Sequence, residues 1–219
     1  MEGKMINTIL DIHTHRREAD SEGKSIINYK QLADSPFLEG YYYSIGIHPW
    51  ELTMANIEEQ LIFMMNQLPD KRIVAIGEGG LDKLTEASME LQKMAFLMQI
   101  TLSEQYSLPL VIHCVKATDE MLAAKKRFNP TQPWIWHGFR GKPEQATQLL
   151  KQGFYLSLGE HYHGETMKLI PDDRLFLETD ESSIDIEDIL RRAAEVRGVG
   201  VETLREIIRR NIQNVFFKA

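Results

Sequence analysis

Short apolar runs alternate along this chain with longer segments in which apolar residues recur at helical spacing. Runs that are apolar throughout are typical of strands buried on both faces of a parallel sheet, with the connecting helices outside it. The runs cover residues 6–12, 41–47, 73–76, 108–112, 134–136, 154–158 and 175–177, and a weaker eighth candidate covers 25–29. Helical stripes occupy 57–68, 91–102 and 204–215, and Lys142-Pro143 and Gly153 bound a further helix.

Eight strand candidates with interleaved helices in 219 residues favour a small (β/α)8 barrel, and an open doubly wound sheet is the alternative. No linker or low-complexity tract interrupts the alternation, so we expect a single domain over 1–219. In the last helical stripe, Asn211 shares the apolar side with Ile207, and we expect it to bond a buried partner.

Composition narrows the setting in which the protein works. The net charge of −7 disfavours broad attraction to polyanions or anionic membranes, so any contact with nucleic acid would be local. The single cysteine, Cys114, cannot form an intrachain disulfide, and strand alternation turns it away from His113, which predicts a buried structural thiol.

Residues 1–12 lack the apolar core of a signal peptide, and no run approaches the roughly 18 apolar residues of a membrane span. We therefore expect a cytoplasmic protein that does not enter a membrane.

Five of the apolar runs end in residues of metal-ligand type. These residues are His13, His15, Glu78, His113, His137 and Asp180. In a parallel barrel the carboxyl ends of all strands lie on one face, so the six side chains are expected to converge on one pocket. His13 and His15 are two positions apart, and such positions of a strand point the same way, so both rings can reach one cation.

Each of these residues also has an ordinary structural explanation, such as a helix-capping acid for Glu78 or a hydrogen-bonded core histidine for His113. One polynuclear metal site explains all of them together, because polar groups buried at successive strand ends need compensation. Four histidines and two carboxylates exceed the ligands of one open catalytic metal, which indicates two cations with Glu78 as the bridge. Mixed imidazole and carboxylate ligation suits Zn, Mn, Co, Ni or Mg.

Seven short blocks follow one another in a single order over essentially the whole chain. They are Asp11-Ile-His13-Thr-His15, Gly46-Ile-His48-Pro49, Gly77-Glu78-Gly79-Gly80-Leu81-Asp82, Ile112-His113, Trp136-His137-Gly138-Phe139-Arg140-Gly141, Leu177-Glu178-Thr179-Asp180 and residues 211–216. In these blocks the sequence resembles the TatD family of metal-dependent hydrolases, within the amidohydrolase-like superfamily of barrels. The resemblance implies a two-metal site at the mouth of a barrel and activity on phosphodiester bonds in DNA, often from a free end.

The resemblance also implies roles for individual residues. His13, His15 and Asp180 resemble the ligands of one metal, His113 and His137 resemble those of the second, and Glu78 is shared. His48 resembles the family's histidine beside the substrate, and its alternative role is to fix the turn before Pro49. Asp180 would also take the proton of a water that the two cations make reactive, so Asp180 and Glu78 are the predicted catalytic residues.

Some blocks depart from the family pattern. The segment from His15 to His48 is shorter than usual, which predicts a distorted or shortened barrel between the first and third strands. Lys83 and Leu84 follow Asp82 where the family usually has aromatic residues, so one surface for stacking a base is expected to be missing.

Basic residues lie just beyond the ligand runs and predict a positive rim that attracts phosphate, with ordinary solvated surface charge as the alternative. They are Arg16, Arg17, Lys83, Lys116, Arg140 and Lys142. Together with His48, Lys116 and Arg140 are the predicted substrate-binding residues.

The sequence thus predicts a metal-dependent phosphodiesterase, in particular a deoxyribonuclease that acts on DNA ends as a monomer. One alternative is hydrolysis of a small amide, ester or phosphate at the same site. A second alternative is a metal-binding scaffold without catalysis, against which the presence of all the ligand residues argues.

Overall fold

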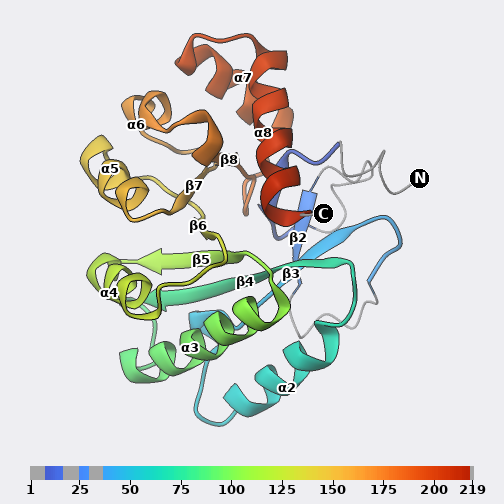
Figure 1. Cartoon of the computed structure of the whole chain (residues 1–219), viewed down its shortest axis with the longest axis vertical. Coiled ribbons are helices and arrows are strands. Elements are labelled where there is room, and N and C mark those ends of the chain that lie inside the picture. Colours follow the sequence, from blue (N-terminus) through green and yellow to red (C-terminus); the bar gives the residue numbers. More distant parts are fainter. Residues whose placement is uncertain (1–7, 17–24, 30–36, 218–219) are drawn as a thin grey trace. The chain divides into compact units, whose positions relative to one another are not determined.

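The computed structural model describes residues 8–16, 25–29 and 37–217. Its strands are β1 (Asp11–Thr14), β2 (Ser25–Tyr29), β3 (Tyr42–Ile45), β4 (Ile73–Asp82), β5 (Leu110–Val115), β6 (Trp134–Trp136), β7 (Tyr155–Leu158) and β8 (Leu175–Leu177). Its α-helices are α2 (Ile57–Gln67), α3 (Met89–Tyr106), α4 (Thr118–Phe128), α5 (Pro143–Lys151), α6 (Gly164–Leu169), α7 (Ile186–Arg197) and α8 (Val201–Phe216). Two 3₁₀ helices, η1 (Pro49–Glu51) and η2 (Asp172–Arg174), precede α2 and β8 (Figure 1).

The strands follow one another in chain order and close into a barrel. The pairs β1–β2, β1–β8, β3–β4, β4–β5 and β7–β8 are parallel. The fold is therefore a (β/α)8 barrel, as predicted, and the open-sheet alternative is wrong. The weak strand candidate at 25–29 is β2, so no strand is lost between β1 and β3. The expected shortening concerns residues 17–24 and 30–36, which lie outside the described residues.

Most strand boundaries differ from the predicted runs by a few residues, and the differences at β1 and β4 have clear physical reasons. The run at 6–12 predicted a strand that ends before His13, whereas β1 begins at Asp11 and contains His13. Ile9 and Leu10 are buried ahead of this strand, but pairing with β8 begins at Asp11, opposite Leu177. β4 continues beyond its apolar run as far as Asp82, because its glycines allow it to stay paired with β5.

The predicted helices are present as α2, α3, α5 and α8, with ends that differ by a few residues. Helices α4, α6 and α7 are additional. α4 buries only Met121 and α6 has 6 residues, so neither presents a readable apolar stripe, whereas the stripe of α7 was overlooked. Among the helices of the described residues, none combines the length and apolar character that crossing a membrane requires.

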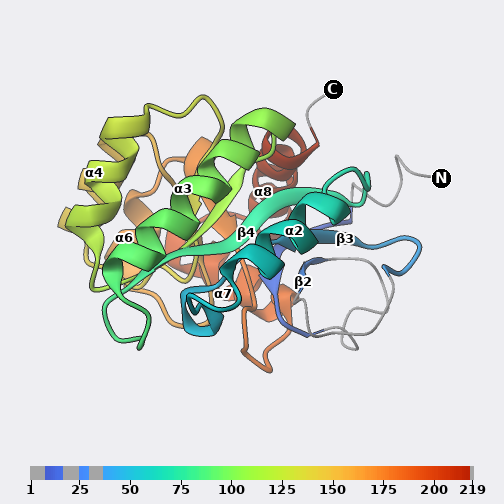
Figure 2. The ribbon, with the colours of Figure 1, turned by 90° about the horizontal axis from the view of Figure 1, so that it is seen from below.

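The chain divides into two compact units, one of residues 28–37 and 43–135 and the other of residues 1–27, 38–42 and 136–219. In the 28–135 unit, α3 runs along β4 (Figure 2). The buried side of α3 includes Gln92 and Gln99, whereas Met94 of the predicted stripe is exposed. The side-chain oxygen of Gln99 accepts from Ile47 N (2.9 Å) and that of Gln92 from Asp82 N (2.7 Å). The two amides thus fix the segments that carry His48 and Asp82.

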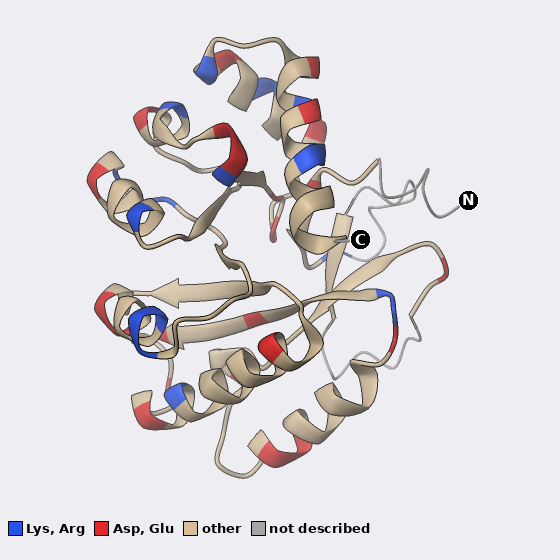
Figure 3. Cartoon of the chain, in the orientation of Figure 1, with Lys and Arg blue, Asp and Glu red and all other residues tan. Residues whose placement is uncertain are grey.

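In the other unit, α7 and α8 lie side by side (Figure 1). On the buried side of α8, Asn211 donates to the carbonyl oxygens of Asp172 (2.5 Å) and Leu175 (2.9 Å). This confirms the predicted buried partner and ties α8 to the start of β8. Figure 3 shows cations and anions interspersed on both helices, and Arg205 pairs with Glu187 at 2.6 Å.

Candidate metal centre

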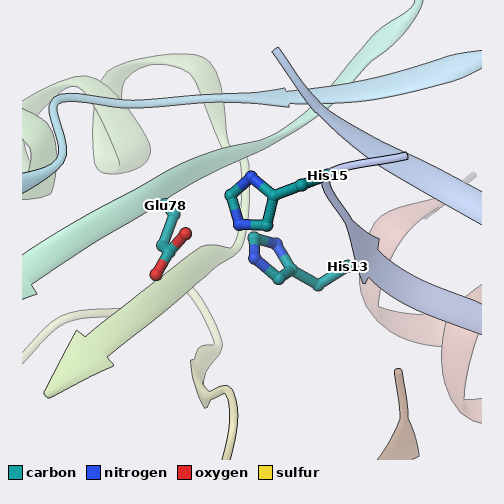
Figure 4. A group of neighbouring side chains, drawn as sticks. All are labelled: His13, His15 and Glu78. Carbon is teal, nitrogen blue, oxygen red and sulfur yellow. The ribbon is translucent and has the colours of Figure 1, made fainter. Parts of the chain in front are cut away.

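One cluster of metal-ligand side chains comes from β1 and from the residues after β6 and β8. A ligand atom each from His13, His137 and Asp180 lies within 4.8 Å of the others. The Nε2 atoms of His13 and His15 lie 3.9 and 3.4 Å from Oδ1 of Asp180. Figure 4 shows the rings of His13 and His15 projecting from the same strand end, as their spacing predicts. Their ring centroids lie 5.0 Å apart. We call these four residues the first cluster.

Backbone hydrogen bonds between β1 and the end of β8 hold the first cluster. Asp180 N donates to His13 O (2.9 Å), and His15 N donates to Asp180 O (3.1 Å). Asp180 adopts a left-handed backbone with φ 54°, so its side chain leaves the strand direction immediately after β8. The carboxylate is therefore placed by main-chain contacts that do not involve its own oxygens.

Asp11 lies beneath this cluster and was assigned no role by the sequence analysis. Its carboxylate is buried and accepts from His13 N (3.1 Å), Thr179 N (3.1 Å) and Thr179 Oγ1 (2.7 Å). Burial raises the pKa of Asp11 to about 7, against the lowering effect of these hydrogen bonds. Asp11 thus joins β1 to the strand end that carries Asp180.

Glu178 lies next to the imidazole ring of His137 in the first cluster. Its side chain is fully buried, and Oε1 lies 3.4 Å from His137 Nδ1 and accepts from Gly138 N at 2.5 Å. A buried carboxylate beside the second nitrogen of an imidazole orients the ring and makes it a stronger metal ligand. Glu178 is a positioning residue that the sequence analysis missed, although it lies inside one of the quoted blocks.

The second cluster consists of His48, Glu78 and His113, and these residues also offer ligand atoms within 4.8 Å of one another. Glu78 projects from β4 (Figure 4). Its Oε1 lies 2.8 Å from His113 Nδ1 and 3.2 Å from His48 Nε2. Asn28 holds this acid from two sides, because its Oδ1 accepts from Glu78 N (3.2 Å) and its Nδ2 donates to Glu78 Oε2 (3.4 Å).

Two glycines after Glu78 bring β4 close to its neighbours. A Cβ at Gly80, where φ is +155°, would lie 1.9 Å from the carbonyl oxygen of His113, and a Cβ at Gly79 would lie 2.2 Å from Gln99 Oε1. Any larger residue at Gly80 would push β5 and its histidine away from β4. The run of small residues after Glu78 is thus a packing requirement of the second cluster.

Asp82, at the end of β4, faces the second ring nitrogen of His113. Its Oδ2 lies 3.1 Å from His113 Nε2. Both ring nitrogens of His113 face a carboxylate, so metal ligation through Nδ1 requires the ring proton on Nε2, where Asp82 accepts it. Burial raises the pKa of Asp82, but hydrogen bonds from Trp50 Nε1 (2.6 Å), Leu84 N (2.7 Å) and His113 outweigh it and hold the pKa below its usual range. Asp82 is thus an anion that orients a predicted ligand, and the sequence analysis missed this role.

A second hydrogen bond fixes the tautomer of His48. Trp50 N donates to His48 Nδ1 (3.1 Å), so Nδ1 is the acceptor and Nε2 carries the proton. A protonated Nε2 beside Glu78 and His113 suits a hydrogen bond to a substrate oxygen better than metal ligation. This geometry is compatible with both roles considered for His48, since the same contact also forms the first turn of η1.

The donor atoms of the second cluster fit a divalent cation. With its proton given to Asp82, a neutral His113 directs a lone pair at Glu78 Oε1 only 2.8 Å away. Two electron-pair donors in such contact repel each other unless a cation bound by both, or a second ring proton, lies between them. The first cluster has the same donor chemistry, with two imidazoles directed at one carboxylate oxygen.

The predicted positive rim is only partly present. Arg140 is exposed and lines a cavity of about 170 Å³ together with Thr179 and Asp180. Lys116 is exposed, and its side chain has no hydrogen-bond or ion-pair partner within the described part of the chain. Lys83, in contrast, pairs with Glu120 at 2.7 Å, so its charge is largely neutralised.

The remaining predicted rim residues contribute less or lie elsewhere. Arg16 donates to the carbonyl of Ile184 (3.2 Å), and Lys142 is exposed. Arg17 lies outside the described residues. Cys114 is half-buried rather than buried, and burial still raises the pKa of its thiol to about 12, which makes it a poor nucleophile, as predicted.

A (β/α)8 barrel with imidazole and carboxylate clusters at its strand ends defines a class of barrel proteins that bind divalent cations. Within this class the family follows from comparison with known proteins. The family model described as TatD related DNase matches residues 4–217, and the chain belongs to the TatD family of metal-dependent hydrolases.

Individual relatives agree with this family. The uncharacterized metal-dependent hydrolase YabD of Bacillus subtilis is 35% identical over 148 residues, which cover 64% of this chain and 58% of YabD. The 3'-5' ssDNA/RNA exonuclease TatD of Pantoea ananatis is 30% identical over 206 residues, which cover 78% of this chain and 76% of that protein. The TatD homologue YJJV of Escherichia coli has the same fold, with a TM-score of 0.80 over 98% of this chain and 100% of that chain at 19% identity. The chain thus spans less than two thirds of YabD.

Proposed function

We propose that this chain hydrolyses phosphodiester bonds in DNA from a free end, with two divalent cations bound to the predicted ligands. The observation that carries the proposal is the contact of electron-pair donors within each cluster, such as His113 Nδ1 and Glu78 Oε1 at 2.8 Å. Membership of the TatD family supports it, as does the similarity to the 3'-5' ssDNA/RNA exonuclease TatD of Pantoea ananatis.

We propose that the predicted ligands would hold two cations when metal is bound. His13, His15 and Asp180 would hold one, His113 and His137 would hold the other, and Glu78 would contribute its carboxylate to both. Each of these residues lies in the second half of a strand or just after one, where parallel barrels place their ligands, which supports this assignment. The donor set suits Zn, Mn, Co, Ni or Mg.

The residues of the chain then have distinct tasks in the reaction. When bound, the cations would neutralise charge on the phosphodiester and lower the pKa of water. Asp180 would accept one proton of the attacking water as the water oxygen bonds to phosphorus, while the bond from phosphorus to the leaving oxygen breaks and that oxygen takes a proton from solvent. His48 donates Nε2–H to a phosphate oxygen, and Arg140 and Lys116 hold the phosphates around the scissile bond.

The setting of this activity is also a proposal. We infer that residues 1–219 act as one barrel domain and as a monomer, because the strand order closes within a single chain. The lone cysteine favours a reducing compartment, and we propose the cytoplasm.

A nuclease assay tests the proposal directly. The protein is stripped of metal and incubated with 5'- or 3'-labelled single-stranded DNA in the presence of Mn, Mg, Zn, Co or Ni, beside a panel of small amides, esters and phosphates. Stepwise shortening of the DNA from one end supports the proposal. Turnover of a small ester without DNA cleavage would support the small-substrate alternative, and two bound metal equivalents without any turnover would support the scaffold.

A further inference from the structure

Trp50, in η1, is an exposed aromatic residue beside the second cluster. It is 62% exposed, whereas the other two tryptophans of the chain, Trp134 and Trp136, are buried. Tryptophan offers a large apolar ring face and a polar N–H, and this combination suits it to binding surfaces. Its ring contacts two residues of the cluster edge-on, with centroid distances of 5.0 Å to His48 and 5.7 Å to His113.

Several contacts hold the Trp50 ring in one orientation. Its Nε1 donates to Asp82 Oδ2 at 2.6 Å, the same oxygen that faces His113. Its backbone N donates to His48, and the preceding Pro49 opens η1 with a fixed φ. A rigid ring loses little conformational entropy when a ligand packs on it, so this arrangement is prepared for binding.

The loop after β4 is hydrogen-bonded to Asp82 and to Pro49, next to Trp50. Leu84 N donates to Asp82 Oδ1 (2.7 Å), and Thr85 Oγ1 donates to the carbonyl oxygen of Pro49 (3.3 Å). Leu84 is also largely exposed. The carboxylate of Asp82 therefore anchors two neighbouring segments that each present an apolar side chain to water.

The charge of the chain restricts how a nucleic acid could be held here. The net charge is −7, and Lys83, the basic residue next to Asp82, is paired with Glu120. Stacking of bases on an aromatic face does not depend on such charges and accepts any base. Trp50 is an aromatic residue next to the segment of Lys83 and Leu84, where the sequence predicts that a stacking surface is missing.

We propose that the indole of Trp50 stacks on a nucleobase of single-stranded DNA and so places the adjoining phosphate at the ligand clusters. This inference rests on the proposed function and names the part of the substrate that the site recognises. It makes Trp50 a substrate-binding residue that acts through its ring face, while its nitrogen remains bonded to Asp82.

A double-mutant cycle between protein and substrate tests the stacking. The wild type and Trp50→Leu are compared on an oligothymidine and on the same oligonucleotide with abasic tetrahydrofuran residues at its cleaved end. Loss of one stacked base is worth about tenfold in kcat/KM, so the wild type is expected to lose about tenfold on base removal. Trp50→Leu should lose about tenfold on the intact oligonucleotide and little more on the abasic one. Trp50→Phe, which keeps a ring without the Asp82 bond, should keep its sensitivity to base removal.

Ile62→Ala, which shortens an exposed apolar residue on α2, is the matched control and should behave as the wild type. Fluorescence gives a second readout, because binding of oligothymidine should quench the exposed Trp50 and the abasic oligonucleotide should not. If Trp50→Leu loses a further tenfold in kcat/KM when the base is removed, the two losses are independent and the inference is overturned. Equal quenching by both oligonucleotides would also overturn it, and neither result would affect the nuclease function. If the wild type cleaves no oligonucleotide with any of the metals, the proposed function fails and the stacking role fails with it.

Discussion

The backbone N of Asp180 donates to the carbonyl oxygen of His13 at 2.9 Å. Main-chain atoms thus hold Asp180, which follows the last strand, next to the first strand of the barrel. The side chain can therefore be changed without loss of the contact that places it. This separation of position from chemistry makes Asp180 the best single test of the mechanism.

Asp180→Asn is expected to reduce turnover by at least about 100-fold, because an amide cannot accept the proton of water. The fold should be retained, since asparagine tolerates the left-handed backbone at this position, where φ is 54°. Steady-state kinetics and thermal unfolding check both points. Asp173→Asn, at an exposed position in η2, is the control, and an Asp180→Asn enzyme with parental activity would remove Asp180 from the mechanism.

Asp82→Asn is expected to weaken metal binding by about 10- to 100-fold, because the amide is a poorer acceptor for the Nε2 proton of His113. Isothermal titration with Mn or Zn measures the change. Asp70→Asn removes a carboxylate that pairs with Arg72 at the surface of the same unit and should leave metal affinity unchanged. Equal affinities of Asp82→Asn and the wild type would show that Asp82 does not orient a ligand.

Removal of metal is expected to lower the thermal stability of the protein. A ligand that binds only the folded state at 100 times its Kd stabilises it by about 2.7 kcal/mol. Treatment with EDTA should therefore lower the Tm and added Mn should restore it, as followed by differential scanning fluorimetry. The shift should be reduced in His113→Ala and preserved in His163→Ala, an exposed histidine at the start of α6. An identical Tm with and without EDTA would contradict a structural role for the cations.

Gly80→Ala is expected to destabilise the protein by about 3 kcal/mol, because a Cβ would lie 1.9 Å from the carbonyl oxygen of His113. Gly153 also has a positive φ, but a Cβ there meets no atom within 4 Å, so Gly153→Ala should cost only about 1 kcal/mol. Urea unfolding compares the two variants. Equal destabilisation would mean that the close approach of β4 to β5 is not what requires glycine.

Cys114 is expected to resist alkylation in the folded protein. Burial raises the pKa of its thiol to about 12, so at pH 8 only about one molecule in ten thousand carries the reactive thiolate. Iodoacetamide labelling followed by mass spectrometry should be far slower in the native protein than in urea. A native rate close to the denatured one would place this thiol in a much less buried setting.

The strand-end positions of the candidate ligands could be predicted from sequence, because each follows a short apolar run and parallel strands end on one side of a barrel. The residues that support them could not. Asp82 and Glu178 act through distances to His113 and His137, and these depend on the pairing register and on the glycines that extend β4. The place of Trp50 beside the second cluster could not be predicted either, because no pattern in the sequence distinguishes an exposed indole from a buried one.

The carboxylate oxygen of Asp82 that faces His113 also accepts from Trp50. A change at position 82 therefore alters an imidazole and an indole at the same time. Laboratory evolution of this protein toward new substrates should leave position 82 untouched and vary position 50 instead, since a change there alters the indole without removing the carboxylate that faces His113.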